Sequence, residues 1–216
     1  MILRYTDLLS RGLSVNQIQR LGWEESGRPL VVDDIVGKRT LAAHYLDPSC
    51  VRTPIAAMAL SQLLEGAQEA VGQNNKGRFP RRYMPTRWYG GSWCAGFASW
   101  CARAALGERV IPWTVGAQRL GERVAAKGTS IKDAHQLQPD DFVVWDRDGA
   151  DPGDDPSDDR NGHVGIVVAV DATHFYTIEG NRGRTGIVRV FRYNKDSPHM
   201  VNGPFIQGAR LPGDAS

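Results

Sequence analysis

The order of sequence patterns predicts an α+β fold, in which helices come first along the chain and strands later. Apolar residues recur at helical spacing between residues 54 and 127, whereas β-branched and aromatic runs dominate from Phe142 onward. The 216 residues, 41% hydrophobic and 23% charged, suit one globular domain with a small additional segment. Because helices and strands are segregated, we expect helices packed on an antiparallel sheet rather than a doubly wound parallel sheet.

Composition and charge exclude several classes of function. A net charge of +2 gives no basis for nucleic-acid binding, and no apolar run is long enough for a transmembrane helix. The first residues lack the apolar core and cleavage site of a secretory signal. Three cysteines, an odd number without a CxxC pair, favour neither a disulfide framework nor a zinc site. We expect a monomer with no metal, no cofactor and no nucleic-acid or membrane partner.

The first part of the chain, residues 1–48, is predicted to be a small helical segment, and residues 49–216 to be the main domain. Short helices are expected at Asp7–Leu13, Val15–Leu21 and Lys38–Tyr45.

The main domain is predicted to begin with three helices. Thr53 is a suitable cap for the first, Pro54 suits its first turn and Gly72 its exit. Residues 73–92 are polar and rich in glycine, which indicates a loop. The other two helices are expected at Cys94–Leu106 and Val115–Lys127, each followed by a glycine.

Four strands are predicted after the helices, at Phe142–Trp145, His163–Val170, Phe175–Ile178 and Ile187–Tyr193. The connection Asp146–Asp159 is rich in Asp, Pro and Gly. Its carboxylates are ligands of the kind that calcium prefers, but it lacks the full EF-hand pattern. Because these residues are also the usual turn formers, we favour a solvated loop and expect no metal site.

Cys94 is the candidate nucleophile, because it follows Gly91-Ser92-Trp93 and opens a predicted helix. Exposed amides at a helix start favour the thiolate over the thiol and can also hold an oxyanion. The alternative is an inert core cysteine, since free cysteines are usually buried. Cys101, two turns along the same helix, is expected only to pack.

His163 is the candidate base, at the start of a predicted strand. If the following loop is centred on Asp171, a hairpin count places His163 directly opposite Glu179, and opposed residues share a face of the sheet. A carboxylate beside an imidazole orients it and raises its basicity. Asn181 offers the same support by hydrogen bonding. The alternative is a surface pair at a strand end.

Several segments together resemble the CHAP family of cysteine, histidine-dependent amidohydrolases and peptidases, a branch of the papain-like NlpC-type hydrolases. The matching strings are AVGQNNKGRFPRRYM at 70–84, GSWCAGFASWC at 91–101, PDDFVVW at 139–145, GHVGIVVAVD at 162–171 and TIEGN at 177–181. The resemblance implies a papain-like fold with Cys94 as nucleophile, His163 as base, and Glu179 with Asn181 orienting the base.

Two neighbours of these residues, Trp93 and Gly162, are assigned to substrate binding. The sequence departs from the family where Asp140 replaces the usual glycine of a turn. The approach to the cysteine, RRYMPTRWYGG at 81–91, is basic, whereas some relatives carry acidic calcium ligands there.

A weaker resemblance links VNQIQRLG at 15–22 and VVDDIVGKRTLAA at 31–43 to the helical peptidoglycan-binding domain. Such a segment either binds the cell wall or forms a small core docked on the catalytic part. The apolar residues available for that core are Val32, Ile35, Leu41 and Ala42.

The resemblances imply a hydrolase that cuts amide bonds in the peptide of bacterial peptidoglycan, as an N-acetylmuramoyl-L-alanine amidase or an endopeptidase. The alternatives are a cysteine amidase or acyltransferase acting on a small amide, and an inactive wall-binding module. Without a signal peptide, we expect synthesis in the cytoplasm and action on the wall after lysis or non-classical export. A phage endolysin and a secreted antibacterial effector with an immunity protein both fit.

Overall fold

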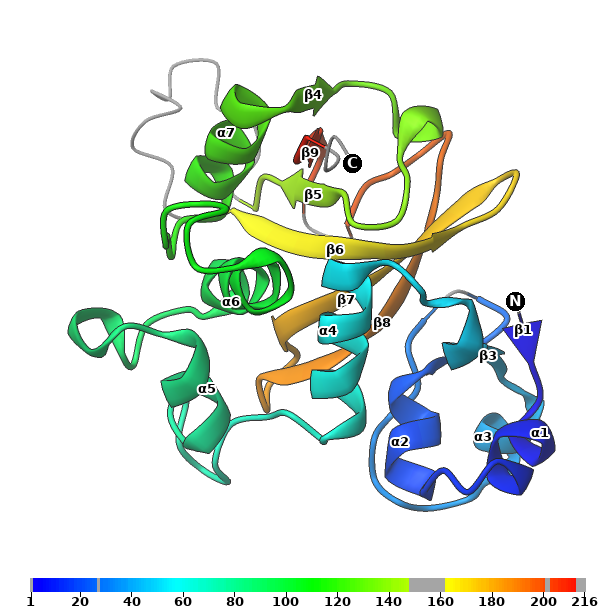
Figure 1. The fold of residues 1–216 in the computed structure, drawn as a ribbon. Coiled ribbons are helices and arrows are strands. Elements are labelled where there is room, and N and C mark those ends of the chain that lie inside the picture. The colour runs from blue at the N-terminus through cyan, green and yellow to red at the C-terminus, as the bar shows by residue number, and fades with distance from the viewer. Residues whose placement is uncertain (1, 27, 148–161, 201–202, 213–216) are drawn as a thin grey trace.

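The computed structural model describes residues 2–26, 28–147, 162–200 and 203–212 (Figure 1). Its main sheet has the strand order β4-β9-β5-β6-β7-β8, and every neighbouring pair is antiparallel. These strands are β4 (Thr129–Ile131), β5 (Phe142–Trp145), β6 (His163–Val170), β7 (His174–Arg182), β8 (Ile187–Asn194) and β9 (Phe205–Arg210). The antiparallel sheet expected from the sequence is confirmed.

Three helices cover one face of this sheet, namely α4 (Pro54–Leu64), α6 (Cys94–Leu106) and α7 (Ala117–Lys127). Alternate residues of β6 point to them, so Val164, Ile166 and Val168 share one core with the helices. The opposite face has a smaller core around Val143, Val167 and Tyr193. The predicted α+β architecture, with the Cys94 helix packed on the sheet, is confirmed.

The first helix of the main domain is shorter than the sequence predicted. It ends at Leu64 rather than near Gly72, because Gly66 adopts a positive φ of 80° and turns the chain away. Residues 73–92, expected to be a loop, contain the short helix α5 (Arg78–Tyr83) and a 3₁₀ turn at Thr86–Trp88. Further 3₁₀ turns lie at Pro48–Cys50 and Ala134–Gln136.

Asp140, the residue that departs from the family pattern, has a defined structural role. Its φ of 76° lies in the left-handed region that glycine adopts most easily. Its Oδ1 accepts hydrogen bonds from the hydroxyl of Thr53, at 2.6 Å, and from the amide of Ala56, at 2.7 Å. The carboxylate therefore caps α4, which a glycine cannot do.

The hairpin between β6 and β7 has a different register from the one the sequence predicted. Its turn is the tight pair Ala172–Thr173, because the Asp171 carboxylate accepts the amides of Thr173 and His174. With a bulge further along, Ile166 pairs with Ile178 and the predicted register is wrong by two residues. An even shift keeps every side chain on its face, so His163 and Glu179 still share one.

The N-terminal segment contains the three predicted helices, all shorter than expected, and a small sheet that the sequence did not reveal. The helices are α1 (Tyr5–Ser10), α2 (Val15–Arg20) and α3 (Lys38–Ala42), and the sheet order is β1-β3-β2, from β1 (Ile2–Leu3), β2 (Gly22–Trp23) and β3 (His44–Leu46). Strands of two or three residues have no alternation long enough to recognise. The division of the chain at residue 48 stays a prediction.

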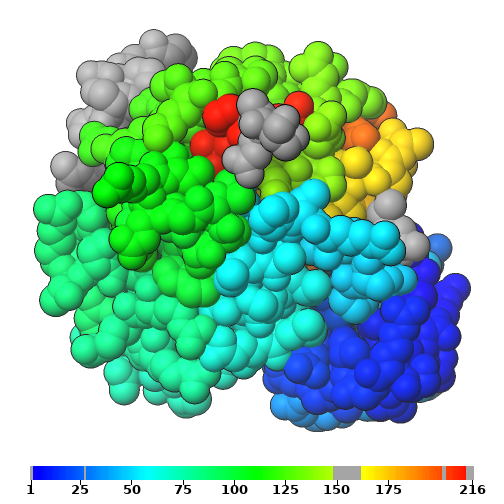
Figure 2. Space-filling view, in the orientation of Figure 1, coloured from blue at the N-terminus to red at the C-terminus, as the bar shows by residue number. Residues whose placement is uncertain are grey.

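This segment is docked on the main domain through buried polar and apolar contacts. The guanidinium of Arg20, 1% exposed, donates to the carbonyls of Ala67 and Val188 at 3.1 and 3.0 Å. Trp23 packs on Tyr176 with ring centroids 5.3 Å apart. In the space-filling view the segment (blue) lies directly against the region of α4 (cyan; Figure 2). Its core is therefore continuous with that of the main domain. Within the described ranges, no helix is both long and apolar enough to cross a bilayer.

Candidate active site

Cys94 is the first residue of α6 and is 4% exposed. Burial by itself raises the pKa of the thiol. The hydrogen bond and charge of His163 and the amide of Ala95 outweigh burial, so the pKa of Cys94 lies below its usual value. Cys101 lies on the same helix without such partners, and burial raises its pKa well above the usual range. Of these two thiols, Cys94 is therefore the one whose pKa is lowered.

His163 is the first residue of β6, and its ring is buried between Cys94 and Glu179. Its Nε2 lies 2.8 Å from Oε2 of Glu179. Burial lowers the pKa of the imidazole, but its contacts with the thiol and the carboxylate together raise the pKa above the usual value. The opposite shifts of Cys94 and His163 favour a thiolate–imidazolium pair. Nδ1 has no other hydrogen-bonding partner in the described part of the chain, which leaves it to the thiol.

Glu179 is fully buried and holds its charge through several contacts. Besides His163, it accepts hydrogen bonds from the hydroxyls of Thr177 at 2.6 Å and Tyr193 at 2.9 Å, and Arg182 Nε lies 3.3 Å from Oε2. Burial raises the pKa of this carboxyl, but Arg182, His163 and Thr177 outweigh it and hold the pKa at about 2. The sequence predicted Glu179, whereas Thr177, Arg182 and Tyr193 were missed because only the folded sheet brings them together.

The diagonal contact between His163 and Glu179 depends on Gly165. Glu179 is two residues out of register with His163, so its side chain crosses over position 165 to reach the imidazole. A Cβ at Gly165 would lie 2.8 Å from Cγ of Glu179 and 3.2 Å from Cβ of Thr177. Because Gly165 has no side chain, the carboxylate of Glu179 has room to reach the imidazole of His163.

Gly165→Ala is expected to lower kcat by about tenfold or more, because the added methyl group displaces Glu179 and a small misplacement of catalytic groups is costly. Steady-state hydrolysis and thermal melting test this. Gly116→Ala, whose added Cβ would come no closer than 3.6 Å to a neighbour, is the control. Unchanged activity in folded Gly165→Ala would contradict the role given to this glycine.

Glu179→Gln is expected to reduce kcat less than His163→Ala does, by a margin of about a hundredfold, because orienting members of a catalytic unit contribute less than the base. The amide keeps the shape but loses the charge that favours the imidazolium. Single-turnover hydrolysis of both variants gives the comparison. Equal losses in the two would show that Glu179 does more than orient His163.

The pH dependence of Cys94 alkylation offers a direct test of the ion pair. Because the thiolate reacts and its pKa is lowered, the midpoint of iodoacetamide modification is expected below the ordinary thiol value of about 8.5. In His163→Ala burial dominates, so the midpoint should rise above that value. The same measurement in a Cys50→Ser, Cys101→Ser background isolates Cys94. The same midpoint in His163→Ala as in the wild type would contradict the pairing of Cys94 with His163.

The start of α6 is held by an aromatic cluster that includes Trp93. Trp93 is fully buried, donates from Nε1 to Glu69 at 2.9 Å and stacks on Tyr83 with centroids 5.5 Å apart. The substrate-binding role predicted for the Trp93 side chain is therefore corrected to one of packing. Gly180 of β7 lies against the same ring, where a Cβ would be 2.8 Å from it.

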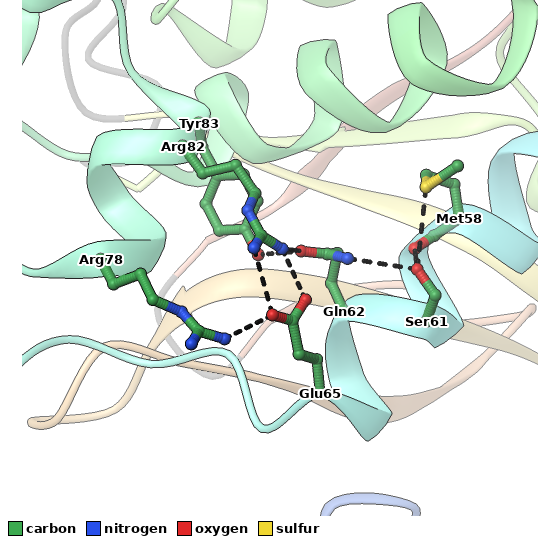
Figure 3. A network of polar contacts seen from close by, with 7 residues as sticks. All are labelled: Met58, Ser61, Gln62, Glu65, Arg78, Arg82 and Tyr83. Carbon is green, nitrogen blue, oxygen red and sulfur yellow. Dashed lines mark hydrogen bonds and ion pairs between the residues drawn. The ribbon is translucent and has the colours of Figure 1, made fainter.

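A polar network fixes this cluster to α4 (Figure 3). The hydroxyl of Tyr83 donates to Gln62 at 2.8 Å, and Arg82 binds both Gln62 and Glu65. Arg78 adds a second ion pair to Glu65. The basic residues before the cysteine, which the sequence showed as a departure from calcium-binding relatives, thus tie α5 to α4 and support the helix that carries Cys94.

The other two predicted site residues are Asn181 and Gly162. Asn181 has a φ of 59° at an irregularity of β7, and among the described residues no hydrogen bond joins it to His163, whose Nε2 contacts Glu179. Its predicted role in orienting the base is corrected, since Glu179 alone holds Nε2. Gly162 is half-buried beside Ala117 of α7, and its role in substrate binding stays a prediction.

The Asp-rich connection falls largely on residues 148–161, which lie outside the described residues. Of its acids only Asp146 is described, and it is 9% exposed. Over the described ranges, no group of three or more His, Cys, Asp or Glu residues is arranged to hold a metal ion.

A buried thiolate–imidazolium pair with an orienting carboxylate defines the class of cysteine hydrolases. Residues 86–181 match the family model of the CHAP domain, a stretch that includes Cys94, His163 and Glu179. Residues 86–181 therefore carry a CHAP domain, the domain that the sequence resembled.

Two further comparisons were made with known proteins. Among solved structures the chain is similar to NlpC2 from Trichomonas vaginalis, with 17% identity and a TM-score of 0.43 over 85% of this chain and 53% of that chain. The chain thus spans about half the length of that protein. No curated protein matches it.

Proposed function

We propose that the protein hydrolyses amide bonds in the peptide of bacterial peptidoglycan through an acyl-enzyme on Cys94. The observation that carries the proposal is the buried contact of His163 with both the thiol and Glu179. Burying these charged groups costs desolvation free energy, and their pairing gives a nucleophilic thiolate at neutral pH. A wall-binding module without activity would have no use for it.

The chemistry follows from the positions of the three groups. The Cys94 thiolate attacks the amide carbonyl, and the amides at the start of α6 stabilise the resulting oxyanion. The imidazolium of His163 gives its proton to the leaving amine as the C–N bond breaks, which leaves a thioester. His163 then takes a proton from water, whose oxygen attacks the thioester and releases the acid and the thiolate. Glu179 balances the charge of His163 in the steps in which the imidazole is protonated.

The cell wall is favoured as substrate by the CHAP domain and by the N-terminal resemblance to peptidoglycan-binding sequences. The scissile bond is either N-acetylmuramoyl-L-alanine or one within the peptide. Digestion of purified sacculi, followed by mass spectrometry of the fragments, separates the two, because only the amidase leaves muramic acid with no amino acid attached. Cleavage of glutathionylspermidine or another small amide, with intact sacculi, would contradict the proposal and favour a small-molecule amidase or acyltransferase.

The biological setting we propose is that of a phage endolysin or a secreted antibacterial effector. Both act on the wall from the periplasm or the exterior, and the second requires an immunity protein. Co-expression with the product of the neighbouring gene distinguishes them. A tight complex that inhibits hydrolysis identifies an effector, whereas a neighbouring membrane protein that permits lysis identifies an endolysin.

A further inference from the structure

A second concave site lies at the edge of the main sheet, outside the catalytic unit. It is a pocket of about 640 Å³ formed by three segments that are distant in sequence. They are residues 29–32 of the N-terminal segment, residues 68–74 after α4, and the turn that joins β7 to β8. The segment after α4 bonds directly to that turn, since the amide of Glu69 donates to the carbonyl of Gly186 at 3.0 Å.

The charged residues of this pocket are predominantly basic. Among its described lining residues, Arg182, Arg184 and Arg189 contribute positive charge, and Glu69 contributes the negative charge. Glu69 is 7% exposed and its Oε1 already accepts from Trp93. Its carboxylate is therefore held by the aromatic cluster. Arg182 is likewise paired with Glu179, so Arg184 and Arg189 supply the excess of positive charge in the pocket.

Arg189 lies close enough to other arginines of this region for their charges to repel it. It donates to the carbonyl of Leu30, while its Nε is buried without a hydrogen-bond partner in the described part of the chain. Burial first, and then the charges of Arg182 and Arg20, lower the pKa of Arg189 to about 10. A bound anion would relieve this repulsion.

The pocket is connected to both halves of the catalytic unit. Arg182 lines it and also contacts Glu179, which orients His163. Glu69 lines it and also holds Trp93, the residue before Cys94. Because β7 runs antiparallel to β6, the turn after Arg182 lies at the edge where β6 begins with His163. The site thus lies beside the reaction centre and suits a part of the substrate away from the scissile bond.

We propose that this pocket is a subsite for a carboxylate of the wall peptide, with its arginines as the recognition groups. The inference rests on the proposed function. Arginine binds carboxylates through charge-assisted hydrogen bonds, and Val31, Val32 and Ile187 supply apolar contact for an aliphatic stem. The subsite would select peptides with a free acid over amidated peptides.

Val71 provides the cleanest test, because it lines the pocket and is 95% exposed. For soluble muropeptides with free carboxylates, Val71→Glu is expected to raise KM about fivefold by repulsion, with kcat unchanged. Val71→Gln, of the same size but neutral, should leave KM unchanged. Arg184→Gln should raise KM about threefold, whereas Arg192→Gln, on β8 but outside the pocket, should not.

The same assays are repeated on amidated muropeptides, in which the free carboxylate is replaced by an amide. Wild-type KM should be about fivefold higher for the amidated form, and Val71→Glu should then have no further effect. Equal KM values for the two substrates in wild type, or equal effects of Val71→Glu and Val71→Gln, would overturn the proposal.

A binding experiment separates this inference from the proposed function. Glutarate and inorganic phosphate are titrated into the full chain, with backbone NMR shifts of residues 182–186 as the readout. If glutarate binds and Val71→Glu weakens the binding, the subsite is supported, whether or not the protein cleaves wall peptides. A failure to cleave wall peptides would refute the proposed function alone. Absence of glutarate binding, or binding of phosphate alone, would overturn the carboxylate assignment.

Discussion

Cys94→Ala is expected to abolish hydrolysis of purified sacculi, with a loss of at least about a thousandfold, and His163→Ala to be as damaging. The reason is that His163 contributes most of the stabilisation that offsets burial and keeps Cys94 as a thiolate. Because the two residues act as one unit, the double variant should be no worse than either single variant. Dye release from labelled sacculi measures the rates.

Cys101→Ala is the matched control for these variants, because it removes a buried thiol from the same helix without touching the ion pair. It should remain active, with at most a lower melting temperature. Lysis by folded Cys94→Ala at a rate near wild type would refute the mechanism. Loss of activity in folded Cys101→Ala would show that the other thiol is the nucleophile.

Removal of residues 1–48 is expected to make the protein aggregate or melt at a much lower temperature. The deletion exposes the apolar surface beneath Ile18 and Trp23, which belong to the same core as α4. It also removes Arg20, whose buried guanidinium donates to the Ala67 and Val188 carbonyls, and so loses two buried hydrogen bonds. Activity on sacculi and on soluble muropeptide should therefore fall together. Melting curves and both assays on the truncated protein give the result.

The alternative role of this segment, wall binding, predicts a different pattern. Binding to sacculi would be lost while cleavage of muropeptide is retained, because a small substrate gains nothing from tethering. The docked contacts favour the structural role. The double variant Ile35→Asp, Leu41→Asp provides a test without truncation, since these side chains are 66% and 54% exposed and lie outside the proposed carboxylate subsite. Weaker binding to sacculi with an unchanged melting temperature would show that the docked segment also binds the cell wall.

Local signals predicted the elements that carry the site with good accuracy. The strands Phe142–Trp145 and His163–Val170 and the helix Cys94–Leu106 have the predicted bounds. Each is delimited by its own residues, such as Gly107 with a φ of 98° after the helix. Non-local contacts explain the failures. The sheet of the N-terminal segment and the burial of Trp93 depend on residues far apart in the chain.

The sequence by itself singled out Cys94 and His163 as the candidate reacting residues, because a cysteine at a helix start and a histidine at a strand start are local features. Only the tertiary structure decided how they are held. A tight turn and a bulge shifted the β6–β7 register by two residues, and the absence of a side chain at Gly165 let Glu179 cross to His163. Register depends on the balance of contacts along both strands and on the turn, so a count from one assumed loop cannot fix it. The contact nevertheless formed on the predicted face because strand side chains alternate with a period of two.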